Sequence, residues 1–442
     1  MDVLRHSSYM FRSQLLRCIL PRETQSFSTV EPEPNIHRPT KACQCYQERQ
    51  TLHYWKQRRL GTHSAFVGSL FSPLMYKCHH TGSPYDMGYA HGELMKKNVS
   101  AMIDRLWDYI EKEATDAINK SLPGFHPWFL KDVIDYGLDV ALDLERLATE
   151  KHTGSYIFEE AKGLADASGV DYKKRILFDV RSLGDSLPVP GSLLQLRSLD
   201  FIVDGPLQDY PQVTVYHPTS ATNGHAFANF GWTGWIASIT GISTQMAISE
   251  IGVSYPDESF GKESRFGVPF TYLLRDILQF DETLDDAVNR ISNSARTCDL
   301  ILGVGDGKLG EFRGVEYSAS VSNFFDDQNL QPKADWHPRI NNVVYWGMDW
   351  LCKSYSAVFA RQLQKYHGNI TADNVIRDMV SIIQSGDLQA AIYDLKNSVA
   401  YLANARASHA SGPGSAYDRQ FIRLDMKTLF NEEAPRRTGL YP

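Results

Sequence analysis

Apolar residues recur at helical spacing in the part of the chain that follows Tyr85. Between Met95 and Ile110 they fall three or four residues apart, which is typical of an amphipathic helix. Two prolines end this pattern, because proline cannot continue a helix interior. Further helices are predicted over Phe129–Thr149, Tyr156–Ala167 and Tyr172–Val180. The pattern predicts a helical layer.

After Pro190 the pattern changes to short apolar runs, which are typical of β-strands. The predicted strands are Leu193–Phe201, Val213–Tyr216, His225–Gly231, Trp235–Thr240, Met246–Ile251, Leu300–Val304, Glu311–Tyr317, Gln389–Tyr393, Val399–Ala403 and Phe421–Leu424. Helices return at Val268–Phe280, Thr283–Ser294 and Thr371–Gln384. Because strands and helices come in blocks, the pattern predicts an α+β fold in which sheets pack on each other and helices cover them.

The first 60 residues are polar and contain several prolines, so we interpret them as a poorly ordered leader. Residues 1–22 contain four arginines, one acid and several serines, which is typical of a mitochondrial presequence. Three sequons, at Asn98, Asn119 and Asn369, indicate instead a glycosylated protein on the secretory route. Mitochondrial residence and lysosomal or secreted residence both stay open.

Composition excludes several classes of protein. The chain has 45 Lys+Arg and 52 Asp+Glu, a net charge of −7, which argues against a nucleic-acid binder. Its apolar runs are all shorter than the ~18 residues that a membrane span needs. Six cysteines are too few for a disulfide scaffold, and Cys43-Gln-Cys45 lacks a second pair at zinc-site spacing. We therefore predict neither a metal nor a cofactor.

Two motifs have a structural and a functional interpretation. Residues 303–308 read Gly-Val-Gly-Asp-Gly-Lys, but a predicted strand follows them, so we predict a turn and not a phosphate loop. An aromatic cluster around Trp232 and Trp235 either lines an acyl pocket or belongs to a sheet core.

Two further segments are more specific. Gly82, Gly88 and Gly92 surround a predicted helix start, which favours close backbone packing. Arg197 and Asp200 stand at the end of an apolar strand. That pair is either a surface salt bridge or a charge pair that holds a catalytic α-amine and a substrate carboxylate.

These segments resemble a known family. The Gly82–Gly92 segment is similar to the entry motif of the acyl-coenzyme A:6-aminopenicillanic-acid acyltransferase family. Arg197-Ser-Leu-Asp200 resembles its Arg-Asn-x-Asp strand, which acid-ceramidase-like and bile-salt-hydrolase-like relatives share. Similar segments follow in the family's order at 213–218, 231–235, 239–241 and 248–250, so that the resemblance covers about 81–424.

The resemblance implies an N-terminal-nucleophile hydrolase, a four-layer αββα sandwich with a helical prosegment that self-cleavage separates from the core. The segments would be a leader (1–60), the prosegment-like region (61–190), the core (191–430) and a tail (431–442). The freed residue would attack the substrate while its own α-amine acts as base. The implied activity is hydrolysis or acyl transfer on an N-acylated small molecule or lipid amide, through an acyl-enzyme.

The resemblance also assigns roles to single residues. Asp200 would orient the α-amine and Arg197 the acyl or carboxylate end of the substrate. Trp232, Trp235 and Glu250 would contact the substrate. An asparagine late in the chain supplies an oxyanion donor in the family; here Gly347 stands near the expected position, and Asn342 is the candidate substitute.

The chain departs from the family pattern at the nucleophile. The family usually has a cysteine shortly before the Arg-x-x-Asp strand, but no cysteine lies between Cys78 and Cys298. Ser186 is the candidate in its place, with Ser182 and Ser192 as the other hydroxyls in the window. Two prolines at 188 and 190 disfavour a central strand there. The alternative prediction is therefore a catalytically inactive member that keeps the fold and binds acyl ligands.

Overall fold

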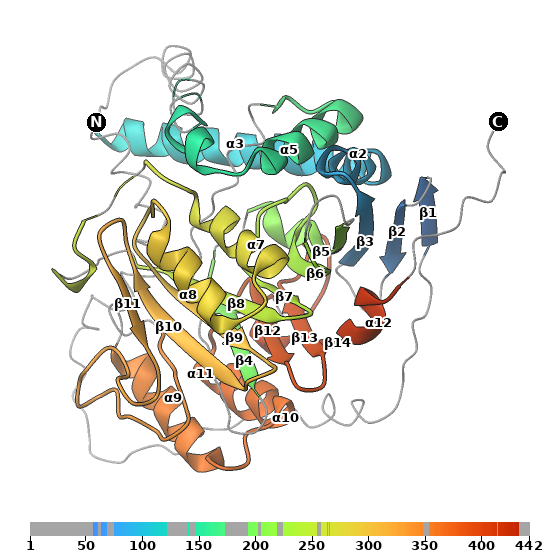
Figure 1. The fold of residues 1–442 in the computed structure, drawn as a ribbon. Helices are drawn as coiled ribbons and strands as arrows, with labels where there is room; N and C mark the ends of the chain where they lie inside the picture. The colour runs from blue at the N-terminus through green and yellow to red at the C-terminus, as the bar shows by residue number, and fades with distance from the viewer. Residues whose placement is uncertain are drawn as a thin grey trace.

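The computed structural model describes residues 56–60, 63–68, 75–121, 140, 143, 146–172, 193–201, 205–218, 224–253, 258–262, 264, 266–347, 353–412 and 414–432. This part of the chain combines helices with two mainly antiparallel sheets, one of ten strands and one of four (Figure 1). The mixed α and β class predicted from the sequence is confirmed.

The ten-stranded sheet is ordered β1-β2-β3-β5-β6-β7-β8-β9-β10-β11. Its strands are β1 (Lys56–Leu60), β2 (His63–Gly68), β3 (Met75–Gly82), β5 (Pro211–Pro218), β6 (Phe227–Trp232), β7 (Gly241–Ser243), β8 (Met246–Gly252), β9 (Leu300–Asp306), β10 (Glu311–Tyr317) and β11 (Ser322–Phe325). Neighbouring strands are antiparallel except β3 and β5, which run parallel. Strands β1, β2, β3, β7 and β11 were not predicted from the sequence pattern. Residues 56–60, the end of the predicted leader, form β1.

The four-stranded sheet is ordered β14-β13-β12-β4. Its strands are β4 (Leu194–Leu199), β12 (Gln389–Asp394), β13 (Val399–Asn404) and β14 (Ile422–Asp425). β4 is an edge strand, because β12 pairs with one side of it and no other described strand pairs with the second side. All six β4 residues are nevertheless buried.

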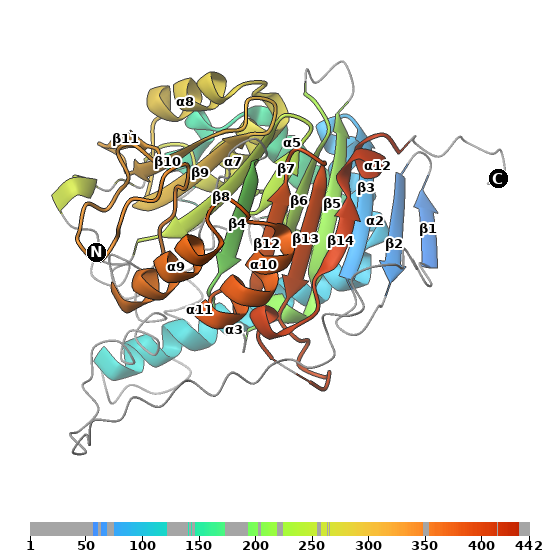
Figure 2. The same ribbon diagram turned by 90° about the horizontal axis from the view of Figure 1, so that it is seen from below.

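The two sheets lie face to face (Figure 2). One apolar cluster contains Val215 and Phe230 from the larger sheet and Ala391 and Leu402 from the smaller one. A polar contact also joins the sheets, in which Gln195 Nε2 of β4 donates to the Ser249 hydroxyl of β8 at 3.1 Å. The interface between the sheets is therefore a mixed apolar and polar core.

Helices pack on the outer face of each sheet. The larger sheet forms one core cluster with α2 (Pro84–Leu94), α3 (Lys96–Ser121), α5 (Ser155–Ser168), α7 (Phe270–Phe280) and α8 (Leu284–Asn293). The smaller sheet packs against α9 (Lys353–Tyr366) and a continuous helical stretch of α10 (Ala372–Asn374), the π-helical η8 (Val375–Val380) and α11 (Ser381–Ile383). The other helices in the described ranges are η3 (Glu150–His152), η4 (Leu207–Asp209), η6 (Glu258–Phe260), η9 (Ala416–Asp418) and α12 (Met426–Phe430). The predicted helices at 129–149 and 172–180 lie mostly outside the described residues.

Helices α2 and α5 meet at backbone distance, as the glycine spacing predicted. A Cβ atom on Gly88 would lie 1.9 Å from the Glu160 carbonyl oxygen, and one on Gly163 would lie 2.1 Å from the Tyr85 carbonyl oxygen. Only glycine permits this approach, since either contact is far shorter than carbon and oxygen tolerate. The two helices therefore pack as one close pair.

The predicted strand at 235–240 is wrong. These residues form an irregular buried segment between β6 and β7. Two of its backbone groups bond to α7: Ser238 N–H donates to the Thr271 carbonyl at 3.1 Å, and the Ile236 carbonyl accepts from Arg275 Nη1 at 2.5 Å. Its contacts with β6 are single hydrogen bonds at its two ends, from Trp235 N–H to the Trp232 carbonyl and from Phe230 N–H to the Thr240 carbonyl, each at 2.9 Å. The apolar run reflects burial beneath helices, which apolarity alone does not distinguish from a strand.

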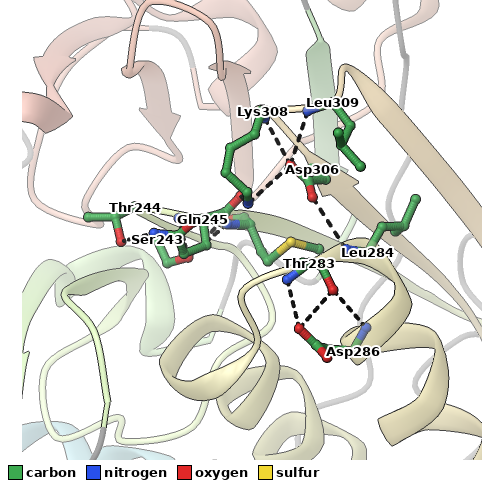
Figure 3. A network of polar contacts seen from close by, with 10 residues as sticks. Ser243, Thr244, Gln245, Thr283, Leu284, Asp286, Asp306, Lys308 and Leu309 are labelled. Atoms are coloured by element: carbon green, nitrogen blue, oxygen red, sulfur yellow. Dashed lines mark hydrogen bonds and ion pairs between the residues drawn. The ribbon is translucent and has the colours of Figure 1, made fainter.

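The glycine-rich segment at 303–308 leads into a hairpin turn, as predicted: residues 303–306 end strand β9, and the turn itself is formed by 307–310. It joins β9 to β10. Figure 3 shows the buried Asp306 carboxylate at its centre, where Oδ1 accepts from Lys308 N–H at 2.8 Å and Oδ2 accepts from Leu284 N–H at 3.3 Å. Asp306 therefore links the hairpin to the start of α8, and its carboxylate binds the backbone N–H groups of Lys308 and Leu309 that a phosphate would need.

Candidate active site

The two charged residues of the Arg-x-x-Asp motif lie on the buried edge strand β4. Arg197 is 0 % exposed and Asp200, directly after the strand, is 8 % exposed. The surface salt bridge considered for this pair is therefore wrong. Burying charges is costly unless partners compensate, so the partners of each group define what the site can do.

Arg197 lies beside a carboxylate from the other sheet. Its Nη2 atom is 3.6 Å from Glu250 Oε2 on β8, and both side chains are fully buried. Burial lowers the pKa of Arg197, and the Glu250 carboxylate opposes that effect. The guanidinium stays charged even so, and its N–H donors, which lie in one plane, suit a carboxylate or a carbonyl oxygen. The structure thus brings together two residues that the sequence analysis named separately.

Asp200 is held by a turn that follows α11. Its Oδ2 accepts from the Ser385 hydroxyl at 2.8 Å, and its Oδ1 accepts from the backbone N–H groups of Gly386 and Asp387 at 2.6 and 3.1 Å. Burial raises the pKa of Asp200, whereas these hydrogen bonds and the Arg197 charge oppose the rise. The arrangement is that of a carboxylate fixed in one orientation.

Trp232 and Trp235 are buried and pack edge to face, with ring centroids 5.7 Å apart. They belong to the same apolar cluster as Leu199, which directly precedes Asp200. This observation shows a core role for both rings and leaves their contact with an acyl chain a prediction.

Asn342 and the candidate nucleophile have no described contact that joins them to this site. Asn342 lies on an exposed turn with φ +56°, and its backbone N–H donates to Asp327 Oδ2 at 2.8 Å. Ser186, like Ser182 and Ser192, lies outside the described residues.

The three predicted glycosylation sites differ in their surroundings. Asn369 is exposed between α9 and α10, whereas Asn98 is half-buried on α3. Asn119 also lies within α3.

The turn at 385–387 was missed by the sequence analysis. Ser-Gly-Asp after a predicted helix indicates only a turn. Its contact with Asp200 spans more than 180 residues of sequence, which local patterns do not reveal.

Within the described ranges, His, Cys, Asp and Glu side chains do not gather in threes in a manner that would hold a metal ion. The helices in those ranges are each too short or too polar to cross a bilayer.

Known structures give only a distant likeness. A Caenorhabditis elegans ortholog of N-acylethanolamine-hydrolyzing acid amidase matches with a TM-score of 0.38 and 12% identity, over 54% of this chain and 99% of that one. A conjugated bile acid hydrolase from Clostridium perfringens matches with a TM-score of 0.38 and 12% identity, over 56% and 93%. Penicillin V acylase from Agrobacterium tumefaciens has a TM-score of 0.29 at 13% identity, over 50% and 82%. Similarity at this level is not evidence for a shared mechanism.

Sequence relatives are much more similar. No model of a known protein family matches the chain. Protein dcd1A of Dictyostelium discoideum is 35% identical over 379 residues, which cover 79% of this chain and 85% of dcd1A. Protein dcd1B of the same organism is 33% identical over 382 residues, covering 81% and 75%. Identity of this extent over most of both lengths shows common descent, and the chain belongs to the family of the dcd1 proteins.

Proposed function

We propose that this protein is an amide hydrolase or acyltransferase of the N-terminal-nucleophile class, acting on an N-acylated small molecule or lipid amide. The observation that carries the proposal is the pair Arg197 and Asp200, which lies buried at the edge of the smaller sheet with Glu250 opposite. A fixed carboxylate beside a sheet edge is suited to orienting a free α-amine. A buried cation next to it is suited to binding the acyl or carboxylate end of a substrate.

The chemistry needs no cofactor. An N-terminal residue beside β4 attacks the amide carbonyl carbon, and its α-amine, with an ordinary pKa of about 7.7–8.0, takes the proton of the attacking group. The same amine then delivers the proton to the leaving nitrogen, and water or an acceptor amine releases the acyl group. In this scheme Asp200 orients the α-amine and Arg197 binds the acyl or carboxylate end.

The proposal includes the architecture and the processing. We assign the two facing sheets and their covering helices to the αββα sandwich of this class, with 61–190 as prosegment and 191–430 as core. Pairing of β3 with β5 means that strands from both segments share one sheet. We propose Ser186 as the nucleophile and Asn342 as an oxyanion donor. Removing such a donor typically costs about 2.7–4 kcal/mol of transition-state stabilisation.

A second candidate function is a non-catalytic acyl-binding protein with the same fold. The observation that favours it is the lack of any cysteine from 79 to 297, together with the prolines at 188 and 190. Proline removes a backbone donor, so it opposes a central nucleophile strand at that place.

Mass spectrometry of the purified full chain separates the two candidates. The enzyme yields a nick between 180 and 186 with a downstream fragment that begins at a serine, and a hydroxylamine-sensitive acyl adduct on that fragment. Ser186→Ala abolishes both, whereas Ser182→Ala serves as the matched control and leaves both intact. A single uncut chain without an adduct, still able to bind a fatty-acyl amide, supports the binder.

A further inference from the structure

The turn that grips Asp200 is held in place by contacts independent of the carboxylate. The Asp387 side chain accepts from Phe201 N–H at 2.7 Å, and Leu388 N–H donates to the Leu199 carbonyl at 3.0 Å. These two bonds bracket Asp200 on the backbone. The turn therefore stays against the end of β4 whether or not its side chains contact the carboxylate.

Within the described part of the chain, three hydrogen bonds hold the Asp200 carboxylate, and Ser385 supplies the one side-chain donor among them. Gly386 and Asp387 donate only through backbone N–H groups, and both of those bonds end on Oδ1. The Ser385 hydroxyl binds Oδ2 at 2.8 Å and is buried with it. It thus sets the rotation of the carboxylate plane about the Cβ–Cγ bond.

The backbone of the turn is adapted to this task. Gln384 has φ +53° and Gly386 has φ +90°, both in the left-handed region. A Cβ atom on Gly386 would lie 3.0 Å from the Gln389 carbonyl oxygen. A non-glycine residue such as Gln384 in the left-handed region destabilises the folded chain. Such a conformation is therefore kept only where the surrounding structure requires it. In this turn the left-handed conformations direct two consecutive N–H groups and one hydroxyl toward the Asp200 carboxylate.

We infer that Ser385 is a positioning residue, which keeps the Asp200 carboxylate ionised and oriented toward the place where the α-amine of the nucleophile binds. The inference rests on the proposed function for its catalytic meaning. Its structural part, that the hydroxyl stabilises the carboxylate, stands on the described contacts alone. The charged groups around Asp200 are Arg197 on its own strand, Asp387 in the turn and Glu250 behind Arg197 on β8.

The ionisation of Asp200 can be followed through the pH dependence of stability, without any catalytic activity. Burial raises its pKa above the unfolded value, so the folded chain binds more protons than the unfolded one between the two values. Stability then falls as the pH rises through that window. The upper end of that pH window is the pKa of Asp200 in the folded chain. Losing a hydrogen bond to the ionised carboxylate moves it upward by about one to two pH units.

The experiment compares melting temperature against pH for the full chain, for Ser385→Ala and for Ser385→Thr, each with and without Asp200→Asn. We expect Ser385→Ala to move the descending limb upward by ~1 pH unit or more and Ser385→Thr to restore it. In the Asp200→Asn background the two substitutions leave the shape of the profile unchanged. A uniform loss of stability at every pH, or the same shift without the Asp200 carboxylate, overturns the inference.

Kinetics supply the second readout. In an active chain, Ser385→Ala moves the acidic limb of the kcat/KM profile to higher pH, by an amount similar to the shift in the stability profile. A drop in kcat/KM without that shift contradicts the positioning role. A chain that shifts in stability but neither cleaves itself nor turns over substrate refutes the proposed function and leaves the stabilisation of Asp200 established.

Discussion

A buried ion pair between α5 and α7 gives the sharpest prediction of stability. Arg275 Nη2 lies 2.5 Å from Glu160 Oε2, with the two side chains 0 % and 1 % exposed. The guanidinium also donates to the Ile236 carbonyl and lies over the Tyr216 ring, 4.7 Å from its centroid. The pair therefore joins the helical layer to the segment at 235–240 that precedes β7.

The perturbation is Glu160→Gln, which preserves side-chain size and removes the charge. Arg275 would then keep a buried positive charge without its carboxylate, and breaking a buried pair in this way typically costs about 3–5 kcal/mol. The matched control is Glu150→Gln, because Glu150 pairs with Arg146 at 3.9 Å with 53 % and 44 % of the side chains exposed. Exposed pairs of this kind contribute at most about 1 kcal/mol.

Urea unfolding followed by tryptophan fluorescence measures both costs. We expect a large drop in the free energy of unfolding for Glu160→Gln at an unchanged urea dependence, and nearly none for Glu150→Gln. The double variant Glu160→Leu/Arg275→Met should recover part of the loss, because it leaves no stranded charge, although the buried Ile236 carbonyl loses its donor. Equal costs for the two single variants, or a double variant no better than the single one, would refute this reasoning.

Three further predictions concern packing, pH and modification. Gly88→Ala forces α2 away from α5 and should lower the free energy of unfolding by about 1–3 kcal/mol in denaturant titrations, whereas Gly414→Ala, which meets no atom within 4 Å, should change it little. Burial raises the pKa of Asp276 to about 7, with Asp281 adding to the rise and Arg290 opposing it. Stability should therefore fall as the pH rises from about 4 to 7 and Asp276 ionises. In melting temperature measured against pH, Asp276→Asn should remove this decrease, and an unchanged decrease in the variant would contradict the prediction. In secretory-pathway expression, Asn369→Gln should remove one glycan in a gel-shift or mass assay because Asn369 is exposed, and an unchanged mass would contradict this.

Strand and helix periodicity predicted most of the elements after Pro190. β4, β5, β6, β8, β9, β10, β12 and β13 lie where apolar runs indicated, because each has a buried face that requires such residues. The polar segment Lys56–Leu60 shows no alternation of apolar and polar residues, so its pairing with β2 could not be predicted from the sequence. The segment at 235–240 failed for the opposite reason, since a buried irregular segment is as apolar as a strand.

The candidate site divides in the same way. Arg197, Asp200 and Glu250 were identified from the sequence because charged residues inside apolar runs are unusual and the family resemblance gave them roles. Ser385 and the Arg275–Glu160 pair were not, since nothing local distinguishes them from ordinary turn and surface residues. Their importance comes from partners far away along the chain.

Residue order alone determined where the chain reverses, which faces become apolar and where close helix contact requires glycine, since these depend on backbone geometry and side-chain size within a few residues. Only the tertiary structure decided which carboxylate lies opposite Arg197, which donors hold Asp200 and that β4 pairs with β12 at the edge of the described sheet. Each of those facts depends on register between distant strands, and register is set by the packing of the whole core.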